Sequence, residues 1–71
     1  MSEPNHWRES EKHFREGALM ALTNARIARI FGDEKAAQEA ERRSQQYLKW
    51  ADQDRIWGDA YEQGTSYELA N

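Results

Sequence analysis

The residues best suited to chemistry in this 71-residue sequence are two histidines and the carboxylates beside them. His6 and His13 are seven residues apart, which places both on one face of a helix, and Glu9 and His13 form an i,i+4 pair able to touch one metal ion. Glu3-x-x-His6 has the letters of a di-iron helix motif, which needs carboxylates from several helices. A structural zinc site needs about four ligands and a catalytic one about three plus an open position. Because only two or three ligands can be assembled, we interpret both histidines as surface residues and expect no metal and no cofactor.

Nucleophilic and phosphate chemistry is also unsupported. Ser10, Ser44 and Ser66 belong to no nucleophile elbow, and the sequence contains no cysteine. The four glycines are too far apart to form a phosphate-binding loop. A two-helix protein moreover offers little concave surface from which water could be excluded. We therefore predict that the protein is not an enzyme.

The elements that carry these residues are predicted to be helices. Valine is absent and threonine rare, whereas alanine, glutamate, glutamine, arginine and lysine are abundant. The sequence predicts one domain over residues 1–58: a helix over about 3–31, a turn at 32–33 and a helix over about 34–57. Two helices of this length joined by so short a turn must lie antiparallel. The fold class is therefore all-α, an antiparallel two-helix hairpin.

The boundaries follow from capping residues. Ser2 is the expected N-cap of the first helix, with Pro4 in its first turn. Gly32 is expected to end that helix with a positive φ, and Asp33 to cap the next. Gly58-Asp59 is expected to end the second helix, leaving 59–71 as a short C-terminal segment. Thr65-x-x-Glu68 fits a capping box for one further turn, although the end of this segment is expected to fray.

Helical periodicity places an alanine-rich stripe with aromatic residues on each helix. Folding the chain about Gly32 brings Ala25 toward Ala40, Phe14 toward Ala51 and Trp7 toward Trp57. Small residues then face one another near the turn, and aromatic residues gather at the open end. We expect the helices to be close together at the turn and splayed apart at the termini.

A second set of large apolar residues lies on the far side of the first helix. It consists of Leu19, Met20, Ile27, Ile30 and Phe31. A hairpin has only one interior, so these residues are predicted to form a partner or oligomer interface. Dimerisation into a four-helix bundle is the simplest arrangement. A different protein, or the C-terminal segment folding back with Tyr67 and Leu69, are the alternatives.

The first helix also carries a basic arc, and no acid occurs between Gly17 and Gly32. Its members are Arg8, Lys12, Arg15, Arg26 and Arg29. One hypothesis makes them phosphate contacts of a nucleic-acid-associated protein. The net charge is −3, with residues 1–32 at +1 and residues 33–71 at −4. Since such a chain lacks an excess of Lys and Arg, we interpret the arc as a solvated face and consider nucleic acid the alternative partner.

No apolar run approaches the about 20 residues needed to span a bilayer, and the first residues are acidic rather than signal-like. A cytoplasmic protein with no membrane partner is expected. Large aliphatic residues are few, and so short a chain rarely stabilises itself without a disulfide, a metal or a partner subunit.

Three short resemblances bear on function. Gly32-Asp33-Glu34-Lys35-Ala36-Ala37 resembles the turn of a tetratricopeptide repeat over six residues. Ile30-Phe31-Gly32 stands where the secreted Trp-x-Gly hairpins have their signature, so that family is not supported. The opening His6-Trp7-Arg8-Glu9-Ser10-Glu11, the alanine-rich helix and the Gly-Asp turn resemble short uncharacterised α-helical hairpin proteins of actinobacteria and their phages. That resemblance spans most of residues 5–51 and implies an accessory protein or inhibitor that binds another protein. It implies no catalytic or site residues.

Overall fold

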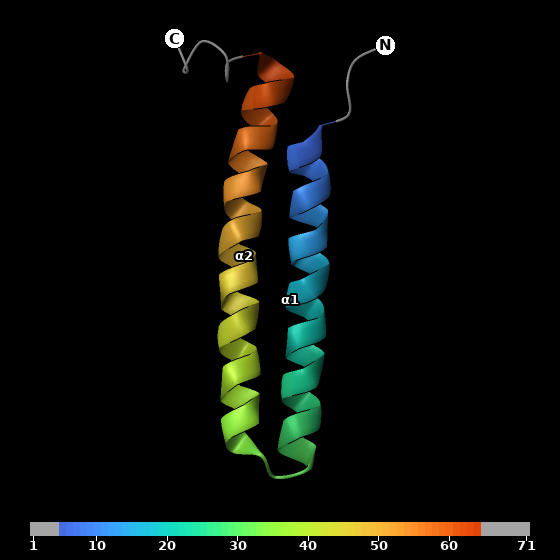
Figure 1. The fold of residues 1–71 in the computed structure, drawn as a ribbon, viewed down its shortest axis with the longest axis vertical. Helices are drawn as coiled ribbons and strands as arrows, with labels where there is room; N and C mark the ends of the chain where they lie inside the picture. Colours follow the sequence, from blue (N-terminus) through green and yellow to red (C-terminus); the bar gives the residue numbers. More distant parts are fainter. Residues whose placement is uncertain (1–4, 65–71) are drawn as a thin grey trace.

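The protein is an antiparallel pair of long helices, as predicted. A computed structural model describes residues 5–64 and contains α1 (His6–Ile30) and α2 (Glu34–Gln63). Figure 1 shows the two helices side by side along their length, with the connecting turn at one end and both chain termini at the other. The molecule is a flat rod of 51 × 24 × 10 Å. This confirms the all-α hairpin.

The first helix begins later than predicted. Asn5, rather than Ser2, is its N-cap: the Asn5 Oδ1 accepts hydrogen bonds from the backbone N–H of Trp7 at 3.1 Å and of Arg8 at 3.4 Å. The Asn5 Nδ2 also donates to the carbonyl of Gly58 at 3.1 Å. A side chain that satisfies orphan donors of α1 and also binds α2 is a strong helix start. Ser2 and Pro4 lie outside the described residues.

The turn has the predicted capping chemistry. Gly32 has a φ of +77°. The N–H of Gly32 donates to the carbonyl of Arg29 at 3.0 Å, and the N–H of Asp33 donates to the carbonyl of Ala28 at 2.8 Å. These two bonds form a Schellman motif. The Asp33 Oδ1 then accepts from the N–H of Ala36 at 3.0 Å, so one helix ends and the next begins without an intervening loop.

The prediction that α2 ends near Trp57 was wrong. Gly58 lies inside the helix, is buried, and a Cβ built on it would sit 3.3 Å from the Cβ of Trp7. Its lack of a side chain therefore serves the contact between the helices and not a turn. The helix instead ends at Gly64, which has a φ of +73°. Residues 59–63 belong to α2, and the predicted capping box from Thr65 to Glu68 lies outside the described residues.

The inner faces of the two helices form a seam of small residues. In α1 the buried positions are Ala18, Ala21 and Ala25. In α2 they are Ala37, Ala40, Ser44, Ala51, Asp54 and Gly58. Successive buried positions are three or four residues apart, except for one step of seven between Ser44 and Ala51, and this is the heptad spacing of a coiled coil. Near the turn, Ala25, Ala37 and Ala40 form one cluster with Ala28 packed against it, which confirms the predicted contact of small residues.

Aromatic side chains gather toward the open end, as predicted, but the helices do not splay. The rings of Trp7 and Trp57 stack with centroids 5.9 Å apart. The Phe14 ring lies 6.1 Å from that of Tyr47 and 5.3 Å from that of Trp50. Each group lies at a glycine: Gly17 faces the Tyr47 ring and Gly58 faces Trp7. Because a glycine opposite an aromatic residue occupies little space, the helices stay side by side up to the open end (Figure 1).

Neither helix among the described residues is long and apolar enough to cross a bilayer.

Candidate functional site

The predicted interface residues lie together on the outer face of α1, away from the seam. We call Leu19, Met20, Ile27, Ile30 and Phe31 the outer stripe. Their exposed fractions are 66%, 67%, 47%, 79% and 82%, respectively. The stripe spans residues 19–31, about 18 Å at 1.5 Å per residue, and ends at the turn. Several large apolar side chains at this exposure on one helix face are typical of an interface.

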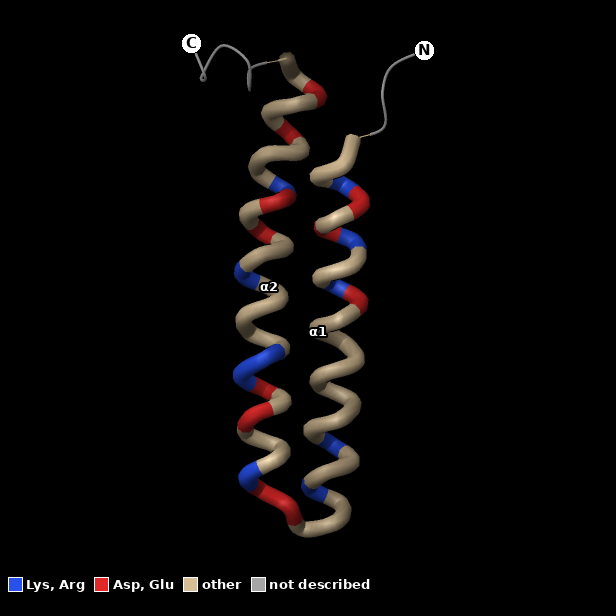
Figure 2. Tube along the Cα trace, viewed as in Figure 1, with Lys and Arg blue, Asp and Glu red and all other residues tan. Residues whose placement is uncertain are grey.

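Thr23 lies between the two ends of the stripe, and its hydroxyl is hydrogen-bonded within α1. The Thr23 hydroxyl donates to the carbonyl of Leu19 at 3.1 Å, within its own helix. A hydroxyl bonded in this way can be covered without losing a hydrogen bond to water. Figure 2 shows that the half of α1 next to the turn carries no acidic residue. In its other half, the same face carries Glu9 and Glu16, both exposed.

Three of the five residues of the basic arc, Arg8, Arg15 and Arg29, form ion pairs with carboxylates of α2. Arg8 forms a bidentate pair with Glu62, with Nε–Oε1 at 2.9 Å and Nη2–Oε2 at 3.0 Å. It also pairs with Asp59. Arg8 thus holds the open end of α1 to the last turns of α2. This geometry leaves its guanidinium engaged with protein carboxylates and not with phosphate.

Arg15 and Arg29 repeat this arrangement farther along the hairpin. Arg15 binds Glu11 at 2.9 Å and reaches Asp52 of α2 at 3.4 Å. Arg29 binds Glu34 at 3.2 Å and also pairs with Glu41, both in α2. Within residues 5–64, Lys12 and Arg26 form no ion pair. The arc is therefore neither a purely solvated face nor an open row of phosphate contacts.

These ion pairs shift the pKa values of the side chains that form them. Hydrogen bonds from Arg8 lower the pKa of Glu62, and the hydrogen bond from Arg29 lowers the pKa of Glu41. The carboxylates in turn raise the pKa of Arg8 and Arg29 above the ordinary value for arginine. All of these groups are exposed or half-exposed, so the shifts indicate where the charges lie and not large contributions to stability. The opposite net charges of residues 1–32 and 33–71 were the sequence signal for this contact.

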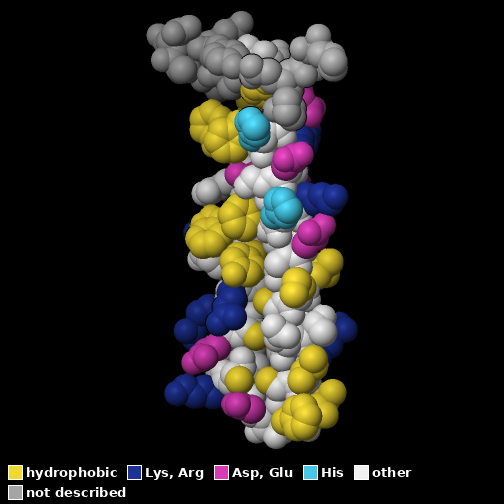
Figure 3. Space-filling view, turned by 45° about the vertical axis from the view of Figure 1, so that its right-hand side comes forward, with side chains coloured by type: hydrophobic (Ala, Val, Ile, Leu, Met, Phe, Trp, Pro, Cys, Tyr) yellow, Lys and Arg dark blue, Asp and Glu magenta, His cyan; other side chains and the backbone are white. Residues whose placement is uncertain are grey.

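Aromatic residues occupy the opposite flank of the seam, where no ion pair is formed among the described residues. Figure 3 shows hydrophobic side chains gathered beside the two histidines toward the open end, and a second group at the turn end of α1. His6 and His13 are exposed. Within residues 5–64, no group of three or more His, Asp or Glu side chains is arranged to hold a metal ion.

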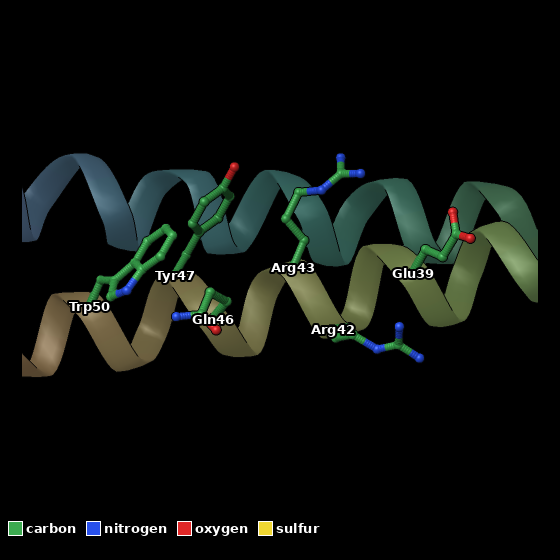
Figure 4. Close-up of a pocket in the computed structure, with 6 residues that line it drawn as sticks. All are labelled: Glu39, Arg42, Arg43, Gln46, Tyr47 and Trp50. Carbon is green, nitrogen blue, oxygen red and sulfur yellow. The ribbon is translucent and has the colours of Figure 1, made fainter.

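A shallow groove of about 430 Å³ lies on α2 and includes two of its aromatic residues. It was not predicted from the sequence. It is lined by Glu39, Arg42, Arg43, Gln46, Tyr47 and Trp50. Figure 4 shows Tyr47 and Trp50 at one end of the groove and the two arginines and Glu39 toward the other, all from α2. The signal was present in the spacing, since Arg43, Tyr47 and Trp50 lie at i, i+4 and i+7 on one helical face.

Comparison with known proteins identifies no relative. No protein-family model matches this sequence. No curated protein and no solved structure is significantly similar to it.

Proposed function

We propose that this protein is a small non-enzymatic interaction protein that binds another protein through the outer stripe of α1. The observation that carries the proposal is the exposure of five large apolar side chains on a hairpin whose seam buries mainly alanine. A soluble protein that leaves its largest aliphatic residues outside and its smallest inside gains most by burying the outer set against a partner. The resemblance to short hairpin proteins of actinobacteria and their phages supports a role as an accessory protein or inhibitor.

Self-association is the simplest form of this function, and it produces a dimer of four helices. Burying one Leu, Ile, Phe or Met side chain contributes about 1.5–3 kcal/mol. Each copy would contribute its five stripe side chains, which are 47–82% exposed in the single hairpin. Among the described residues of α2, the outer side carries the exposed Gln38, Gln45 and Gln53 beside Ile56, whereas the outer side of α1 carries the five apolar residues of the stripe, so α1 supplies most of the contact.

The nucleic-acid alternative is not favoured by the geometry. Arg8, Arg15 and Arg29 are engaged with carboxylates of the same chain. Releasing them to bind phosphate would break the ion pairs that join the helices. Catalysis is not favoured either, since the groove on α2 is open to solvent, whereas active sites exclude water.

Sedimentation and circular dichroism test the proposal. Wild-type protein at high micromolar concentration is expected to sediment above the 8.4 kDa of one chain. The double variant Ile27→Ser/Phe31→Ser should keep most of its helicity and lose association, because it removes apolar anchors of the interface and no residue of the seam.

Ile56→Ser is the matched control. Ile56 is a large apolar residue of α2 with an exposed fraction of 59%, and it lies outside the stripe. This variant should associate like the wild type. Unfolding of Ile27→Ser/Phe31→Ser at every concentration would assign the outer stripe to the folding of the single hairpin. An associating, folded double variant would place the interface elsewhere.

A further inference from the structure

We infer that the occupant of the outer stripe is a second copy of this chain, packed antiparallel so that only the halves of the two α1 helices next to the turn overlap. This arrangement rests on the proposed function and specifies the partner and its orientation. The two-fold axis would cross α1 at the level of residue 25, midway between Leu19 and Phe31. Thr23 of one copy would then lie beside Ile27 of the partner subunit.

Residues 65–71 are too short to cover the stripe. Gly64 ends α2 at the open end of the hairpin, near Asn5, which bonds to Gly58 and Glu62. Ile27 is level with residue 38 of α2 and therefore lies about 39 Å along the rod from Gly64. Residues 65–71 span at most about 25 Å when fully extended. The most exposed part of the stripe, Ile27 to Phe31, is out of their reach.

The distribution of charge along α1 selects the antiparallel overlap. A parallel, in-register pair would place the whole outer faces together, bringing Glu9 against Glu9 of the partner subunit and Glu16 against its own copy. Both are exposed acids on the face that continues the stripe. Like charges placed opposite each other at an interface are unfavourable. An overlap centred on residue 25 places Glu9 about 14 Å and Glu16 about 3 Å past the level of the partner's Gly32, so neither acid faces its own copy.

The overlapping segments are also suited to self-contact. Residues 17–32 contain no acid, and the Thr23 hydroxyl is bonded within its own helix. Arg29 is held by Glu34 and Glu41 on the side facing α2. Arg26 lies at the edge of the stripe and would approach its own copy, but at an exposed rim where solvent and salt screen the repulsion.

Distances between spin labels on the full chain distinguish the possible arrangements. The sequence contains no cysteine, so Glu9→Cys and His13→Cys each give one nitroxide per copy at an exposed site outside the stripe. In the antiparallel dimer the two labels should be separated along the rod by about 48 Å for position 9 and about 36 Å for position 13. The difference of about 12 Å between the separations at positions 9 and 13 identifies the antiparallel dimer, because the length of the label adds equally to both separations. Small-angle scattering should show a longest dimension of about 80 Å, against about 50 Å for a parallel dimer.

Each other outcome overturns a specific statement. Short and nearly equal distances at both sites would establish a parallel dimer, overturning the antiparallel arrangement but leaving the stripe as an interface. Distances that persist when Ile27→Ser/Phe31→Ser is added would place the contact off the stripe and overturn both this inference and the proposed function. A single-chain mass at high micromolar concentration, with no intermolecular distance, would overturn self-association and leave only a different protein as the partner.

Discussion

Asp54 is the residue whose environment is least favourable in the hairpin. It occupies a seam position between Ala51 and Gly58, its exposed fraction is 9%, and its Oδ2 is buried with no hydrogen-bond partner among residues 5–64. A buried polar oxygen that has lost its water costs free energy unless another group replaces that water. At this position the small-residue pattern of the seam is broken by a carboxylate.

Replacing Asp54 by alanine is therefore expected to stabilise the protein. The variant removes the unpaired oxygen, restores a small seam residue and improves helix propensity, which together should raise the free energy of unfolding by about 1 kcal/mol or more. Urea denaturation measures this change. Asp52→Ala is the control, because Asp52 is exposed and its ion pair with Arg15 is long at 3.4 Å, so its effect should stay within about 0.5 kcal/mol. A destabilised Asp54→Ala would show that the carboxylate makes a favourable interaction in the folded state.

Gly32 is required for its backbone conformation and not for space. Its φ is +77°, and a Cβ built on it would have no atom of the described residues within 4 Å beyond its immediate neighbours in the chain. Gly32→Val should therefore destabilise the hairpin by about 1 kcal/mol or more, the cost of a β-branched residue at positive φ. Gly32→Asn, which tolerates this conformation better, should lose less. Equal melting temperatures for the two variants would contradict a conformational cause.

At the scale of the helices, the seam depends on small side chains. Ala25 is 1% exposed and packs with Ala37 and Ala40 near the turn. Enlarging it to leucine should separate the helices or force strained rotamers, at a cost of about 1–3 kcal/mol. Thermal denaturation measures the loss. Asn24→Leu, at an exposed neighbouring position in α1, should change stability little. If Ala25→Leu had no effect, the helices would have room between them that the cluster does not show.

The ion pairs between the helices should make stability depend on pH in a defined direction. The pKa values of Glu41 and Glu62 are lowered from 4.5 in the folded protein by hydrogen bonds from Arg29 and Arg8. Their contribution is therefore present above about pH 4.5 and is lost as the pH falls through the lower, folded pKa. The melting temperature of the wild type should fall as the pH falls over that acidic range. The melting temperature of the double variant Glu41→Gln/Glu62→Gln should depend less steeply on pH. An unchanged pH profile in this variant would assign the acid sensitivity to other carboxylates.

At the scale of the whole molecule, stability is expected to depend on protein concentration. The seam buries alanine, serine and glycine, and the large aliphatic residues lie outside it, so association through the outer stripe would contribute to the stability of the fold. The melting temperature of the wild type should rise with each tenfold increase in concentration. That of Ile27→Ser/Phe31→Ser should stay constant, and a constant value for both would contradict the dimer.

The sequence alone determined the helices, the turn and the two faces of α1. Gly32 and Asp33 carry their capping chemistry locally, and a period of three and four residues is enough to separate Ala25 from Ile27. These features depend on residues near one another in the chain, so one sequence suffices to predict them. The same locality explains the N-terminal error, because Ser2 and Asn5 are both competent caps and the choice depends on the bond from Asn5 to Gly58.

Only the tertiary structure decided what Gly58 and the basic arc do. A glycine followed by an aspartate reads locally as a helix stop, but Gly58 continues α2 because Trp7, 51 positions away, packs against its backbone. From the sequence, Arg8 is expected to be a surface cation. In the structure it joins the two helices through ion pairs with Asp59 and Glu62 of α2. Both outcomes depend on the register between two antiparallel helices. That register is set by close packing of the whole seam, and no local window of the sequence contains it.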